Sequence, residues 1–130
     1  MKREIKFKAW HKEEKILCDV TNLNSDGAFL VGVKKGKDSY TEKYVVYAPE
    51  DGRFCLNEEI ELLQYTGLKD KNGVEIYEGY IVEYEFETDY GPVLHRDTVE
   101  YYAGAFYPIC EMPMSLFEFI GIIYKNPKML

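Results

Sequence analysis

The chain has 130 residues, of which 46% are hydrophobic, 30% charged and 15% aromatic, and its formal net charge is −7. This length and composition are typical of one globular domain that folds without a metal or a disulfide, and they exclude an intrinsically disordered chain. No apolar run is long enough to span a membrane, and the acidic balance disfavours binding to nucleic-acid phosphates.

The first half of the sequence predicts short strands separated by turns. Ile5, Phe7 and Ala9 alternate with Lys6 and Lys8, the period-two pattern of a strand with one solvent-facing side. Further strands are predicted at residues 16–20, 28–33 and 44–48, and turns at 11–15, 21–27, 34–39 and 49–52.

The centre of the chain holds one ambiguous segment and one clear turn. Residues 58–65 have an apolar spacing that fits either two helical turns or a strand, and eight residues are too few to decide. The pair Asn72-Gly73 predicts the tip of a β-hairpin, because both residues readily take the positive φ values of a type I′ turn.

The second half alternates most regularly. From Ile81 to Glu87 apolar and acidic residues alternate, so Val82, Tyr84 and Phe86 are expected to face a core. A second hairpin is predicted at 98–109, around Ala103-Gly104, and a last strand at 117–124. Strands at this turn spacing predict a mainly β barrel or sandwich, with helix confined to short pieces. One domain is expected over residues 1–130, with a possible division into lobes at about 1–62 and 63–130.

Three segments resemble the YopX family of small phage and prophage proteins. The central segment, residues 64–82, reads QYTGLKDKNGVEIYEGYIV and is similar to the family's signature. Residues 3–10 and 119–127 resemble the family's opening strand and closing strand. The resemblance implies a β fold related to small SH3-like barrels or rolls and a phage-associated role, but no activity.

The chain departs from the family pattern at two positions. Tyr80 stands where the family usually has Asp, and His11 stands where it usually has an acidic residue. If either acidic residue has a functional role in the family, this chain lacks it. The residues of the central segment itself are expected to specify the fold rather than to bind a ligand.

Candidate chemistry in the sequence is sparse. His95 and Asp97 are two residues apart and form at most a surface acid–histidine pair, and no nucleophile motif or phosphate-binding loop occurs. Glu83, Glu85 and Glu87 lie too far apart along a strand to share one cation. We therefore expect no catalytic residues, no metal site and no cofactor. Without a signal peptide, and with three widely spaced cysteines, the chain is expected in the host cytoplasm.

The remaining candidate for function is a surplus of tyrosines in the second half. A tyrosine combines contact area, rigidity and a polar tip, so exposed ones are typical of protein interfaces. The candidate interaction surface comprises Tyr65, Tyr77, Tyr80, Tyr101 and Tyr102. Residues 66–130 hold 5 basic and 11 acidic side chains, which further disfavours nucleic acid.

Three functional hypotheses follow, from different classes. The first is a non-catalytic module that binds a protein partner or assembles with itself. The second is a nucleic-acid-associated protein that contacts phosphates through Lys6 and Lys8 of the basic N-terminal strand. The third is an enzyme of unknown class. No membrane partner is expected.

Overall fold

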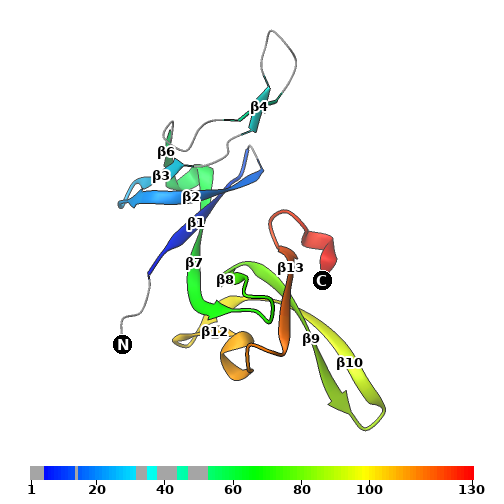
Figure 1. Ribbon diagram of the computed structural model, residues 1–130. Helices are drawn as coiled ribbons and strands as arrows, with labels where there is room; N and C mark the ends of the chain where they lie inside the picture. Colours follow the sequence, from blue (N-terminus) through cyan, green and yellow to red (C-terminus); the bar gives the residue numbers. More distant parts are fainter. Residues whose placement is uncertain (1–4, 14, 32–34, 38–43, 47–52) are drawn as a thin grey trace. The chain divides into compact units, whose positions relative to one another are not determined.

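The computed structural model describes residues 5–13, 15–31, 35–37, 44–46 and 53–130. The chain divides into two compact units, an N-terminal unit of residues 6–63 and a C-terminal unit that contains residues 64–130 (Figure 1). Each unit is built from antiparallel strands. The prediction of a mainly β protein is therefore confirmed.

Helical structure in the described part of the chain is limited to three short 3₁₀ turns. These are η2 (Asn57–Glu59), η3 (Ile109–Glu111) and η4 (Pro127–Met129). No helix within the described ranges has the length and apolar character needed to cross a membrane.

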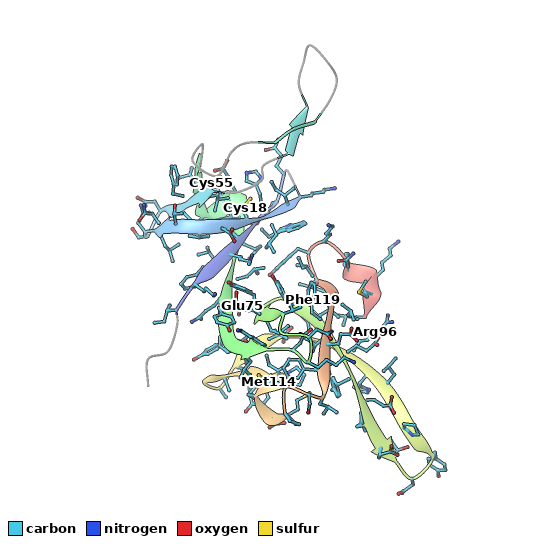
Figure 2. All side chains as sticks on the ribbon, in the orientation of Figure 1. Cys18, Cys55, Glu75, Arg96, Met114 and Phe119 are labelled. Carbon is cyan, nitrogen blue, oxygen red and sulfur yellow. The ribbon has the colours of Figure 1, made fainter. Side chains whose placement is uncertain are left out.

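The N-terminal unit is a twisted antiparallel sheet with a core of small and aliphatic side chains. Its strands are β1 (Phe7–His11), β2 (Ile16–Leu23), β3 (Gly27–Val31), β4 (Lys35–Lys37), β5 (Tyr44–Val46), β6 (Arg53–Leu56) and the start of β7 (Ile60–Lys69). The main sheet runs β6-β3-β2-β1-β7, and β4 pairs separately with β5. Its buried cluster includes Cys18 and Cys55 (Figure 2), together with Ala9, Ala28, Leu30 and Ile60.

The C-terminal unit consists of three hairpin pairings and a closing strand. Its strands are the end of β7, β8 (Glu75–Tyr77), β9 (Tyr80–Thr88), β10 (Gly91–Thr98), β11 (Glu100–Tyr102), β12 (Ala105–Tyr107) and β13 (Phe117–Ile122). β7 pairs with β8, β11 pairs with β12, and β9 lies between β10 and β13 (Figure 1).

The structure resolves the ambiguity at residues 58–65 in favour of a strand. Only Asn57–Glu59 is helical, as one 3₁₀ turn, and β7 then runs for ten residues from Ile60. A helix there would remove the strand that lies between β1 and β8 in the sheet, so strand pairing decides the conformation. The possible helical interpretation of this segment was wrong.

Other predictions from the sequence differ in detail from the structure. β2 continues to Leu23, into a segment expected to be a turn, because its residues pair with β3 as far as Leu23↔Ala28. β4 lies within the expected loop at 34–39, and the turn expected at 49–52 falls outside the described residues. The described strands form open sheets and not a closed barrel, so the SH3-like barrel is not confirmed.

Candidate interaction surface

The central family segment forms the β7–β8 hairpin, whose tip is residues 70–74. The amide of Gly73 donates to the carbonyl oxygen of Asp70 at 3.0 Å, and Gly73 has a φ of +82°. Asn72 does not have a positive φ. The tip is therefore a type I turn followed by a left-handed glycine, not the predicted type I′ turn. The prediction of a hairpin at this position is confirmed.

The buried carboxylate of Asp70 explains the different turn type. Its Oδ1 accepts hydrogen bonds from the amides of Asn72 and Val74, both at 2.9 Å. Such side-chain-to-backbone bonds favour a wider turn that starts at the aspartate. Oδ2 accepts a third bond, of 2.8 Å, from the amide of Phe119 on β13. One side chain thus shapes the hairpin tip and ties it to the closing strand.

Neighbouring contacts strengthen the same junction. The Lys71 amide donates to the Phe117 carbonyl oxygen at 3.1 Å, and the Lys71 ammonium lies 3.3 Å from Glu118. The Asn72 side chain also donates to Glu118, at 3.2 Å. Residues of the central segment, 64–82, therefore make contacts that hold the hairpin against β13.

The tyrosines of the central segment belong to the core. Tyr65, Tyr77 and Tyr80 are each no more than 5% exposed. Their rings follow one another at centroid distances of 5.3 and 5.6 Å, and Tyr80 continues the row to Phe119 at 4.7 Å. These three tyrosines pack inside the C-terminal unit and do not line its surface.

The two departures from the family pattern occupy packed positions. Tyr80 is a member of the aromatic row, and His11 is a buried residue at the end of β1, paired with Ile16. The closing segment is also structural, because Asn126 Oδ1 accepts from the amide of Ile122. A Cβ on Gly121 would lie 2.9 Å from Met129 Sδ and 3.0 Å from that oxygen, so a larger residue here would displace both side chains.

The β11–β12 hairpin carries the exposed part of the predicted tyrosine surface. Tyr101 is 57% exposed and Tyr102 is 72% exposed. Tyr101 lies edge-on to the buried ring of Phe106 at 5.2 Å, whereas Tyr102 lies 6.2 Å from Tyr107 on the other face. Both faces of this short hairpin therefore present a tyrosine held by a neighbouring ring.

The turn of the β11–β12 hairpin is of type I′, the turn type that the sequence predicts for Asn72-Gly73. Ala103 and Gly104 have φ values of +49° and +85°, so they form the two-residue loop with positive φ at both positions that characterises type I′. The tyrosines are thus presented on a tight, well-defined hairpin.

The basic N-terminal strand is partly neutralised by its neighbours. Lys8 Nζ lies 3.1 Å from Asp19 of β2, its partner in the sheet, and Lys8 and Lys6 are half-buried. Lys12 Nζ lies 3.5 Å from Glu61. Two of the positive charges that would attract phosphate are therefore already paired.

Sequence reasoning did not identify the β9–β10 hairpin as a surface feature. We call residues 83–97 the arm; its outer part extends beyond the end of β13 (Figure 1). Phe86, expected to face a core, is 39% exposed, and its ring lies 4.9 Å from His95. The regular alternation shows which side chains share a face, but not whether another layer covers that face.

The base of the arm contains a short hydrogen bond. The Tyr84 hydroxyl donates to Asp97 Oδ2 at 2.6 Å. Partial burial, the hydrogen bond to Asp97 and the negative charge of Asp97 together raise the pKa of Tyr84 to about 12. Tyr84 therefore stays protonated at pH values where an ordinary tyrosine ionises.

The acidic face of the arm forms an ion pair at its base. Glu83 accepts from Arg96 Nε at 2.8 Å, and Arg96 also donates to the carbonyl oxygen of Met129. Glu85 and Glu87 are exposed. Across the described ranges, no group of three or more His, Cys, Asp or Glu residues is placed to hold a metal ion.

Comparison with known proteins places these features in a family. Residues 6–130 match the family model described as YopX protein. Among solved structures, the crystal structure of protein EF1440 from Enterococcus faecalis is similar, with 26% sequence identity and a TM-score of 0.64 over 99% of both chains. No curated protein matches the chain. The similarity extends over both compact units.

Proposed function

The chain belongs to the YopX family, and we propose that it is a phage or prophage accessory protein that works without catalysis, by binding a protein partner or a second copy of itself. The observation that carries this proposal is the exposure of Tyr101 and Tyr102 on opposite faces of one tight hairpin. A tyrosine held by a neighbouring ring loses little side-chain entropy when it is buried against a partner, so such residues favour association.

A nucleic-acid-associated role through Lys6 and Lys8 is the second candidate. It is supported by the basic residues of the opening strand, but the ion pairs of Lys8 with Asp19 and of Lys12 with Glu61 weaken it. The two roles differ in their response to salt, because phosphate binding weakens steeply as counterions compete, whereas burial of aromatic area is little screened.

An enzymatic role is the third candidate. It differs from the two binding roles because a reaction would have to depend on a particular nucleophile or base. The sequence contains no motif for either.

The test compares the wild-type chain with Tyr101→Ser/Tyr102→Ser and with Tyr124→Ser as a matched control. Tyr124 is 42% exposed and lies outside both the β11–β12 hairpin and the arm. We expect the double variant to lose at least about ten-fold in affinity for a partner captured from infected host cells, or in self-association measured by sedimentation. The control should behave as wild type.

Two results would count against the proposal. One is association that is equal in all three proteins. The other is tight, salt-sensitive binding to mixed nucleic acid that is abolished by Lys6→Gln/Lys8→Gln, which would favour the second candidate.

A further inference from the structure

Among the strands that the structure describes, none pairs with the outer edge of β10. β10 pairs with β9 from Gly91↔Thr88 to Thr98↔Ile81, and the sheet order β10-β9-β13 places it at the edge among the described strands. An edge strand presents unpaired backbone N–H and C=O groups, so natural proteins usually protect it with charges or proline. Here Pro92 and Arg96 flank the edge, and the three residues between them are Val93, Leu94 and His95.

The side chains along this edge are apolar and exposed. Leu94 is 57% exposed and Val93 is 39% exposed. Val93 lies directly opposite Phe86, and His95 opposite Tyr84, so their side chains share one face of the ribbon. β13 pairs with β9 only as far as Tyr84, and no described strand continues beyond it. The arm is thus an uncovered, two-stranded surface with an aromatic face.

The charge of the arm indicates which partner it suits. Residues 83–97 contain one arginine and five acidic residues: Glu83, Glu85, Glu87, Asp89 and Asp97. Arg96 is already engaged by Glu83, whereas Glu85, Glu87 and Asp89 have no ion pair or hydrogen bond among the residues described. Pairing with the β10 edge of a second copy would bring two such arms together and is opposed by their repulsion.

We propose that the arm binds a basic, extended segment of a partner protein, which adds as a strand to the free edge of β10. Apolar side chains of that segment would pack beside Val93 and His95. Its lysines or arginines would lie on the opposite face, where Leu94 is paired with Glu85 and Pro92 with Glu87. The backbone contributes affinity in this mode of binding, and the alternate side chains contribute specificity.

This inference shares with the proposed function the premise that the partner is a protein, but it uses a different surface. Tyr101 and Tyr102 lie on β11, which is not part of the β10-β9-β13 sheet. Loss of one binding activity therefore leaves the other measurable.

The probe is a fluorescent synthetic peptide of about ten residues in which lysine and valine alternate, a length that spans an average strand. In the first control peptide, glutamate replaces lysine. In the second, the lysines and the valines are grouped into two separate blocks. We expect anisotropy to report binding of the alternating lysine peptide alone, and to report weaker binding as salt rises from about 50 to about 200 mM. Hydrogen exchange should show new protection at the amides of β10.

Variants of the full chain locate the site. Glu85→Gln/Glu87→Gln should weaken binding about five-fold, because two exposed charges are removed. Glu100→Gln/Glu111→Gln removes the same charge from exposed positions elsewhere and should change binding less than about two-fold. Leu94→Lys places a like charge at the edge and should weaken binding about ten-fold; Tyr101→Ser/Tyr102→Ser should have no effect.

Several results would overturn the inference. These are no binding of the alternating lysine peptide, equal binding of the glutamate peptide, equal effects of the two double glutamate variants, or protection outside β10. Self-association that Leu94→Lys abolishes would instead assign the edge to a second copy. If only Tyr101→Ser/Tyr102→Ser lost its partner, the proposed function would stand and the arm would have no part in it.

Discussion

At the scale of single residues, the carboxylate of Asp70 joins the tip of the β7–β8 hairpin to β13. It is 4% exposed and accepts three backbone hydrogen bonds, from Asn72, Val74 and Phe119. Each of these amides would be left without an acceptor if the carboxylate were lost, and an unsatisfied buried donor is costly. Asp70 therefore has a structural role in the central segment of this chain.

We predict that Asp70→Asn lowers the free energy of unfolding by about 2–3 kcal/mol, because the amide nitrogen cannot accept the bonds that one carboxylate oxygen accepts. Denaturant titration would measure the loss. Asp89→Asn is the matched control, since Asp89 is exposed at the tip of the arm, and it should change stability by less than about 0.5 kcal/mol. Equal stability of the two variants would contradict the role given to Asp70.

Tyr84 leads to a prediction about alkaline pH. Its pKa is raised from 10.0 to about 12, first by desolvation and then by Asp97, so the folded state holds this proton more tightly than the unfolded state. The stabilisation is complete below pH 10 and is lost as the pH rises from about 10 to about 12.

Tyr84→Phe should therefore make the free energy of unfolding fall less steeply across that pH range, because the variant has no phenol to ionise. Unfolding by urea at successive pH values would measure the slope. Tyr90→Phe, at a fully exposed position, provides the control. If Tyr84→Phe and wild type had the same slope, the hydrogen bond to Asp97 would not hold the proton as described.

At the scale of elements, the two tight hairpins of the C-terminal unit show how a turn depends on its surroundings. Asn72-Gly73 is the pair that favours a type I′ turn, yet the carboxylate of Asp70 holds Asn72 at a negative φ. Ala103-Gly104 lacks the favoured asparagine and still forms the two-residue loop, with Ala103 at positive φ. The pairing Tyr102↔Ala105 permits only a two-residue connection there.

We predict that Gly73→Val destabilises the chain by about 1 kcal/mol or more, whereas Gly73→Asn costs much less. No atom lies within 4 Å of a Cβ built on Gly73, so the cost comes from the positive φ alone and not from a clash. Asparagine tolerates the left-handed region and a β-branched residue does not. Denaturant titration of both variants would check this, and equal losses would point to crowding instead.

At the scale of the whole molecule, the two units have different cores and different charge. The N-terminal unit buries small residues such as Ala9, Ala28 and Cys55, whereas the C-terminal unit buries a row of aromatic rings. The family match spans both units, so the family's pattern describes the pair and not one of them alone. The acidic excess lies in the second half, where both proposed binding surfaces also lie.

The sequence by itself determined the features that depend on neighbouring residues. The alternation at 81–87, the hairpins at Asn72-Gly73 and Ala103-Gly104, and the closing strand were all readable, because strand periodicity and turn chemistry are local properties. The family resemblance was readable for a similar reason, since its most recognisable residues shape one hairpin and its junction with β13.

Only the tertiary structure decided which side chains are covered. Tyr77 and Tyr101 are the same type of residue. Tyr77 packs between the rings of Tyr65 and Tyr80, whereas Tyr101 is exposed on a two-stranded hairpin. Likewise, Val82 and Phe86 lie on one face of β9, yet only Val82 is fully buried; β13 begins opposite Tyr84 and runs away from Phe86. Burial depends on contacts between residues far apart in the chain, and periodicity along one strand carries no information about them.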